Sequence, residues 1–209
     1  MSSTLSIAAV TAILKNLLEN SLVQQAGTTG VGDVVVTTLS PDRVAIGADE
    51  RPQLNLYLYR LTPNSGWRRA KLLDGQGAQQ EQPLALDLHY LLSAYGERDV
   101  QAEVLLGVAI QCLQQSAVIS GERVRAALTA LASTKSAHGH ATLAALARAT
   151  STIPLEEITI TPEFLSLEDL SKLWGSLQAH ARLSVTYQVS VMLSPTGDAR
   201  TKQPARAAR

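Results

Sequence analysis

The chain has 209 residues, of which 45% are hydrophobic and 17% are charged, so it is long enough to bury a core without disulfides or metals. Its 18 basic and 18 acidic residues balance, but four of the basic residues lie in the last ten positions, where no acidic residue occurs. The rest of the chain carries 14 basic against 18 acidic residues, and this acidic excess argues against a nucleic-acid-binding face on the folded domain.

The first 40 residues change from a helical to an extended pattern. Apolar residues recur at helical spacing from Leu5 to Leu17, which predicts an amphipathic helix of about five turns that ends before Gly27. Polar residues interrupt this apolar run before it reaches membrane-spanning length, and no basic residue precedes it, so we expect neither a transmembrane helix nor a signal peptide. The valines at 34–36 lie between glycine and proline breakers and predict a short strand.

Two runs of strict alternation predict two further strands. Leucine alternates with asparagine or tyrosine over 54–59, and it alternates with other residues over 84–89, where the run continues into Tyr90-Leu91-Leu92 before the break at Gly96. Because leucine occupies every second position in both runs, we expect the two strands to share one core. Between them lies a polar stretch, residues 63–82, which indicates an exposed loop of about 20 residues, and loops of that length are commonly functional or disordered.

The middle of the chain predicts helices. A helix from Val100 to Gln114 is apolar around most of its circumference, so we expect it to be central and buried. A second helix is predicted from about Gly121 to Ala132, and a shorter one from Leu143 to Ala149.

The last third predicts two strands around a helix. Residues 158–160 indicate a short strand, and Ser166 with Asp169 forms a capping-box-like start for a helix. A final strand from Leu183 to Leu193 alternates apolar and polar residues. The predicted organisation is one α+β domain over 1–195, followed by a basic tail, 196–209, without an apolar pattern.

No spacing in the chain matches a catalytic, cofactor or metal motif. The glycines at 27, 30 and 32 fit neither a dinucleotide-binding nor a P-loop pattern, and we interpret them as turns. His138 and His140 alone make an incomplete metal site and are expected in a solvated loop. Asp87 and His89 share one face of a strand, but no serine lies in a nucleophile elbow, so we interpret the pair as polar surface.

The remaining reactive residues also have structural interpretations. Cys112 is the only cysteine, which excludes a disulfide within the chain and a multi-cysteine zinc site and favours a reducing compartment. It lies in an apolar helix, where a thiol is inert and packs into the core. Glu156 and Glu157 point to opposite faces of a strand, which is wrong for two cooperating carboxylates. We therefore predict no enzyme, no cofactor and no metal.

Two segments have the residue types of a protein interface. Trp67, Arg68 and Arg69 stand together in the polar loop, and tryptophan and arginine are enriched in binding hot spots. The alternative that Trp67 folds back onto its own core stays open. In the tail, Arg200, Lys202 and Arg206 are either solvated or in contact with an anionic partner.

Five blocks in order carry a resemblance to a known family. They are LNLYLYRLTPNSGWRR, PLALDLHYLLSAYG, AEVLLGVAIQCL, ITPEFLSLEDLSKLWGSL and RLSVTYQVSVML. Together they resemble the terminator or cap proteins of extracellular contractile injection systems, which are phage-tail-like particles. The likeness extends from Leu5 to Ser194, and the order of the blocks carries it rather than any single motif.

The resemblance implies a fold and a function. The implied fold is a mixed, largely antiparallel β-sheet flanked by helices, similar to phage tail terminator proteins. The implied function is a structural cap: a ring, typically of six copies, that binds the distal end of the inner tube and the sheath and stops their polymerisation. Its partners would be further copies of itself, the tube protein and the sheath protein, with no nucleic acid; contact with a membrane stays open.

The particle would assemble in the cytoplasm, with release from the cell left open. Two alternatives also stay open at this point. The first is another structural joint of such a particle, in the baseplate or at tube initiation. The second is a small hydrolase or ligand-binding module, which would require a polar pocket with perturbed titratable groups.

Overall fold

The computed structural model describes residues 5–30, 32–47, 50–64, 66, 84–133 and 155–193. Its helices are α1 (Ser6–Thr29), α3 (Gln101–Gln115), α4 (Gly121–Ser133) and α6 (Leu167–Ser176), with a short 3₁₀ helix η2 (Pro41–Arg43). Its strands are β1 (Val35–Thr37), β2 (Gln53–Pro63), β3 (Leu84–Tyr95), β4 (Val118–Ser120), β5 (Leu155–Glu163) and β6 (Ser184–Leu193). The predicted α+β class is confirmed.

The strands form one six-stranded sheet in the order β1-β2-β3-β6-β5-β4. The β1–β2 pair is parallel and every other neighbouring pair is antiparallel, so the sheet is mixed and largely antiparallel, as expected. The long strands β3 and β6 lie at its centre and pair from Leu84–Leu193 to Ser93–Ser184. A bulge interrupts the β2–β3 ladder between Leu58 and Arg60.

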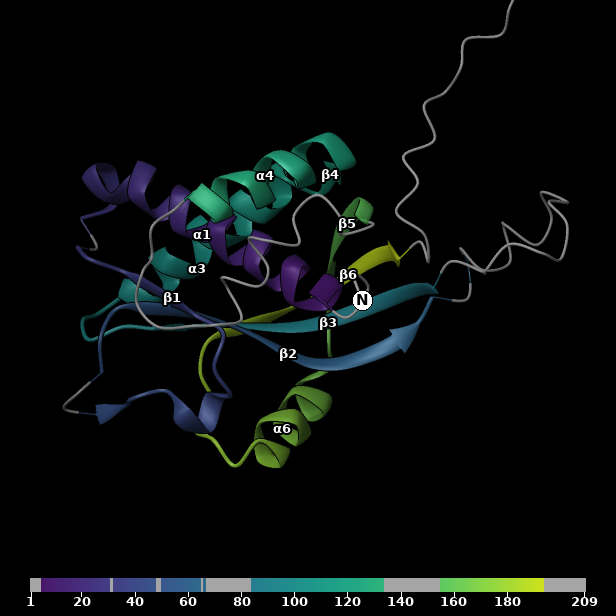
Figure 1. Cartoon of the computed structure of the whole chain (residues 1–209). Coiled ribbons are helices and arrows are strands. Elements are labelled where there is room, and N and C mark those ends of the chain that lie inside the picture. The colour runs from purple at the N-terminus through teal and green to yellow at the C-terminus, as the bar shows by residue number, and fades with distance from the viewer. Residues whose placement is uncertain are drawn as a thin grey trace, which may run out of the picture.

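Helices cover the two faces of the sheet unequally. Helices α1, α3 and α4 gather on one face, while α6 lies on the other (Figure 1). Alternation places Leu88, Tyr90 and Leu92 of β3 toward the three helices, where all three side chains are fully buried. The Tyr90 hydroxyl lies 2.8 Å from the Thr11 hydroxyl of α1, which satisfies the polar end of a side chain buried in the core.

Helix α3 is buried as predicted, on the side that packs against α1 and β3. It follows β3 through Gly96, where an added Cβ would lie only 2.8 Å from the Ala102 nitrogen, so the close approach requires glycine. Cys112 is buried in this helix, and burial raises the pKa of its thiol, which agrees with an inert packing role. None of the helices in the described ranges combines the length and apolar character that a membrane span needs.

Local patterns misplaced several boundaries. The prediction that the first helix ends before Gly27 was wrong: α1 runs to Thr29 and Gly30 follows in the left-handed conformation with φ 64°. Strand β4 was not predicted, since three residues are too few to show a period. Strand β5 extends beyond 158–160 in both directions. The helix predicted at 143–149 falls outside the described residues.

Candidate protein interface

The interface residues predicted from sequence lie outside the described residues. This applies to Trp67, Arg68 and Arg69 in the polar stretch and to Arg200, Lys202 and Arg206 in the tail. The two histidines expected in a solvated loop, His138 and His140, lie outside the described residues as well.

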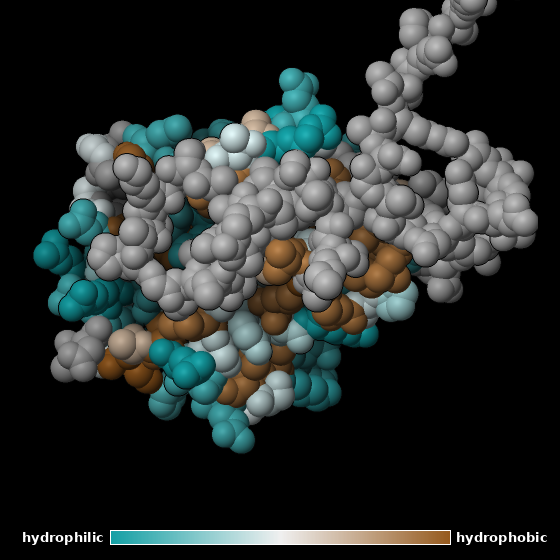
Figure 2. All heavy atoms as spheres, viewed as in Figure 1, coloured by the Kyte–Doolittle hydropathy of each residue, from teal (hydrophilic) through white to brown (hydrophobic). Residues whose placement is uncertain are grey.

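The described hairpin nevertheless fixes where the polar stretch leaves and rejoins the sheet. The backbone N–H of Asn64 donates to the Ala85 carbonyl at 3.0 Å, so β2 and β3 are paired up to the end at which the polar stretch connects them in the sequence. Leu61 and Leu84 near this end are 46% and 55% exposed, and Figure 2 shows apolar surface over this part of the molecule.

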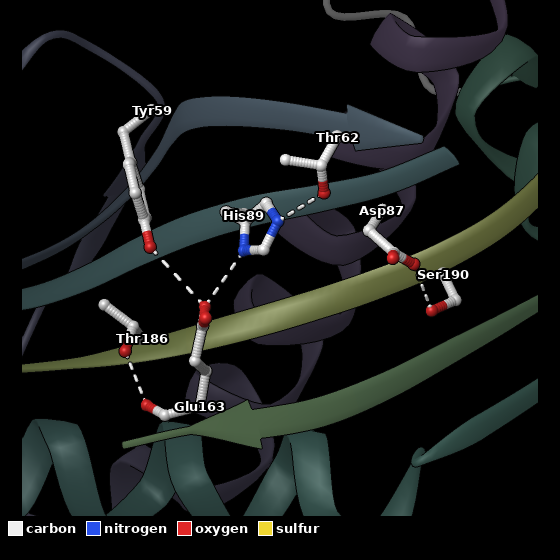
Figure 3. A network of polar contacts seen from close by, with 7 residues as sticks. All are labelled: Tyr59, Thr62, Asp87, His89, Glu163, Thr186 and Ser190. Atoms are coloured by element: carbon white, nitrogen blue, oxygen red, sulfur yellow. Dashed lines mark hydrogen bonds and ion pairs between the residues drawn. The ribbon is translucent and has the colours of Figure 1, made fainter. Parts of the chain in front are cut away.

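Asp87 and His89 are not surface residues, and the prediction that placed them there was wrong. They are 9% and 7% exposed and lie on the sheet face opposite α1. Asp87 Oδ1 accepts hydrogen bonds from Asn64 Nδ2 at 2.8 Å and Ser190 Oγ at 2.6 Å. His89 contacts Thr62 Oγ1 through Nε2 at 2.9 Å and Glu163 Oε2 through Nδ1 at 3.0 Å (Figure 3).

This polar network lacks the connectivity of a catalytic triad. Ser190 bonds to Asp87, whereas His89 bonds to Thr62 and Glu163, so within the described chain no serine hydroxyl is paired with the imidazole that would have to activate it. In the same part of the chain, no group of three or more His, Cys, Asp or Glu residues is placed to hold a metal ion. The arrangement holds strands together instead.

Glu163 ties the end of β5 to three other strands. Its carboxylate contacts His89 of β3 and accepts from the Tyr59 hydroxyl of β2 at 3.5 Å, while its carbonyl accepts from the Thr186 hydroxyl of β6 (Figure 3). Burial, reinforced by the negative Glu163 carboxylate, raises the pKa of Tyr59 to about 12. The strand end is therefore held by both side-chain and backbone contacts.

A second anchor follows immediately, at the start of α6. Ser166 Oγ accepts from the Asp169 amide at 3.1 Å and donates to Asp169 Oδ2 at 2.6 Å, so the predicted N-cap is confirmed. Trp174, about two turns after this cap, is 3% exposed and its Nε1 donates to Ser184 Oγ at 3.4 Å. The helix is thereby docked on the sheet.

Two apolar side chains near Glu163 and Ser166 project into solvent. Phe164, the only phenylalanine of the chain, is 88% exposed, and Leu167 is 82% exposed. We call residues 164–167 the Phe164 segment. Hydrogen bonds hold the residues on either side of Phe164 and Leu165: Glu163 contacts His89, and Ser166 caps α6. The Phe164 segment is therefore exposed although its neighbours in the chain are fixed. A held aromatic residue in solvent is the kind of anchor that protein interfaces use.

A second held apolar segment lies at the other edge of the sheet. Asn55 of β2 has no exposed surface; its amide donates to the Leu39 carbonyl and its oxygen accepts from the Leu39 amide, both at 3.0 Å. Leu39 and Ile46 are 45% and 41% exposed, while Pro41 and Val44 between them are buried. We call residues 39–46 the Leu39 segment.

Sequence reasoning did not single out either segment. Asn55 was assigned only to the face opposite the leucines, and Phe164 appeared only within a family block. The available signal was local: a lone phenylalanine between a strand pattern and a serine cap has no periodic core position to occupy.

Comparisons with known proteins bear on the whole chain. The family model described as the Pvc16 N-terminal domain matches residues 9–207. The fold is similar to the sheath/tube terminator of the PVC extracellular contractile injection system in its extended state, with 15% identity, a TM-score of 0.54, and coverage of 97% of this chain and 61% of that one.

A second solved structure, the tube-terminating cap of the anti-feeding prophage, matches with 15% identity and a TM-score of 0.48, covering 93% of this chain and 58% of that one. The chain thus spans about three fifths of the length of these structures. No curated protein matches it.

Proposed function

The chain belongs to the Pvc16 N-terminal domain family, and from that premise we propose that it is a structural cap of a contractile injection system. In this role it binds the distal end of the inner tube and the sheath and ends their polymerisation. The observation that carries the proposal is the fold shared over 97% of the chain with a sheath/tube terminator, together with the family match over 9–207.

The mechanism is binding and not chemistry. A tube or sheath grows because each ring presents the surface on which the next ring docks, so a subunit that covers this surface without reproducing it stops growth. A sheet with helices on both faces gives such a subunit a stiff body, and segments held at its edges can contact neighbours. The Asp87–His89 network fits this role because its hydrogen bonds connect β2, β3, β5 and β6.

The cap is a ring of identical copies, six in number, and its further partners are the tube protein and the sheath protein. Trp67, Arg68 and Arg69, in the stretch of sequence between β2 and β3, contact a partner, and Arg200, Lys202 and Arg206 contact an anionic one. Tryptophan and arginine bury large areas with directional hydrogen bonds, which supports this assignment. The particle assembles in the cytoplasm.

Particle imaging tests the proposal. Particles are produced with the chain, without it, and with a labelled version, and tube and sheath lengths are measured by electron microscopy. We expect the label at the end distal to the baseplate and tubes of irregular length without the chain. Label at the baseplate, or particles of normal length and closed ends in its absence, would contradict a capping role.

A further inference from the structure

We propose that the Phe164 segment of one copy docks on the Leu39 segment of the next copy in the ring. This inference rests on the proposed function for the existence of a ring, and it goes beyond it by naming the two surfaces that join neighbouring subunits.

Both segments expose apolar side chains on a backbone that is already held in place. Phe164 and Leu167 are 88% and 82% exposed although the residues beside them are held by the Glu163 and Ser166 hydrogen bonds. Leu39 is exposed although Asn55 holds both of its backbone polar groups. Because the backbone is already ordered in each segment, docking orders little additional chain, and little conformational entropy opposes it.

The two segments lie at opposite edges of the sheet of one subunit. The Leu39 segment follows the edge strand β1, and the Phe164 segment follows β5. Strand β4 pairs only with 157–159, so at Glu163 strand β5 is itself the edge of the sheet. From β1 to β5 there are four strand spacings, or about 19 Å.

Helix α6 and the loop after it lie between the two segments. Arg182 of that loop pairs with Glu50, four positions after the Leu39 segment, at 2.9 Å, whereas Phe164 lies at the other end of α6, before its first residue. Two different surfaces at opposite edges are what a head-to-tail ring requires, since every copy must offer one surface and accept the other.

The two segments carry exposed side chains of opposite charge. Beside the Phe164 segment, Glu168 and Asp169 are exposed at the start of α6. Arg43 lies in the Leu39 segment and Arg51 lies beside it. Both side chains are exposed, and neither has an ion-pair partner among the described residues. The nearby acids are already engaged, Asp42 by the Ser40 hydroxyl and Glu50 by Arg182. At the start of α6, Glu168 also pairs with Lys172 of its own helix at 2.6 Å and Asp169 accepts from the Ser166 hydroxyl, but the Glu168 and Lys172 side chains are 76% and 68% exposed, so an arginine of a neighbour can reach these carboxylates. The two arginines therefore complement the acidic start of α6 in a neighbour, around an apolar centre.

Photocrosslinking in assembled particles tests this contact directly. The photoreactive residue p-benzoylphenylalanine replaces Phe164, the particles are irradiated, and the crosslinked chains are identified by peptide mass. We expect a dimer of this chain with the crosslink within 39–46 of the second copy. The same photoreactive residue in place of Val23, which is 78% exposed on α1, is the matched control and should not give that crosslink.

Every other product overturns the inference. A crosslink from position 164 to the tube protein or the sheath protein assigns the segment to another partner, and a crosslink to a different part of a second copy assigns it to another contact. The absence of any crosslink in particles that carry the variant shows that Phe164 remains in solvent.

Charge reversal gives a second readout, which does not depend on one variant folding well. Glu168→Arg and Arg43→Glu should each lower the crosslink yield about two- to fivefold, as expected for an exposed ion pair, and the combined variant should recover it. Failure of the combined variant to recover would contradict the pairing. If the ring crosslinks as expected but labels the baseplate end, the capping proposal fails and this inference stands.

Discussion

Removing the Glu163 carboxylate tests whether the polar network on the sheet face stabilises the fold. In Glu163→Ala, His89 loses the acceptor that lies 3.0 Å from its Nδ1, and the imidazole is 7% exposed, so water can replace that acceptor only in part. A hydrogen bond to a charged group contributes about 1.5–3 kcal/mol, whereas the 3.5 Å contact from Tyr59 adds little. Because the Glu163 side chain is 30% exposed, we expect a loss of about 2 kcal/mol in the free energy of unfolding.

The matched control is Glu168→Ala, five positions along the chain. Glu168 and its partner Lys172 are 76% and 68% exposed, and such a surface pair contributes at most about 0.5 kcal/mol. Urea unfolding of the two variants compares the same chemical change in two environments. With a slope of about 2 kcal/mol per M, Glu163→Ala should lower the midpoint by about 1 M and Glu168→Ala by less than about 0.3 M. Equal midpoints for the two variants would refute the structural role of the network.

Three further predictions follow from burial and hydrogen bonding. Asn55→Ala should cost about 2–3 kcal/mol in urea unfolding, because it removes the partners of both Leu39 backbone groups; a loss below about 0.5 kcal/mol would argue against that anchor. Leu92→Ala should cost about 3–4 kcal/mol through its cavity, against under about 1 kcal/mol for Ile110→Ala, which is 41% exposed; similar losses would show that the core is misassigned. The pKa of Tyr59 is raised from 10.0 to about 12 in the folded protein, so the contribution of this residue to the free energy of unfolding should be complete below pH 10 and should fall as the pH rises from 10 to 12. A free energy of unfolding that stays constant over this pH range would contradict the burial of Tyr59.

Local patterns were sufficient wherever one short stretch decides the structure. The alternation from Leu84 predicted β3, which pairs along its full length, and Ser166 with Asp169 predicted the start of α6. Helix α3 followed from its apolar circumference. In each case the determining interaction joins residues close in the chain, or the period itself says which residues share a face.

Local patterns failed where residues distant in the chain decide the outcome. Asp87 and His89 have the spacing of a polar strand face. Ser190 and Glu163 of other strands, and Asn64 directly after β2, form hydrogen bonds with them, and that coverage buries both. A period of two identifies the residues that share a face and says nothing of what lies over it. The hydrolase alternative weakened for the same reason, since the pairing of serine with aspartate rather than histidine is a tertiary fact.

Short-range patterns were enough to predict the fold class, the order of most helices and strands, and, through five blocks in a fixed order, the likeness to a family of terminators. These follow from hydrophobic periodicity and capping, which act over a few residues. The exposure of Phe164 and Leu167 and the position of the Leu39 segment at the opposite edge depend on the whole folded chain. The exposure of a side chain depends on what packs against it, and here His89, which holds the Glu163 carboxylate beside Phe164, lies 74 residues from Glu163 in the chain.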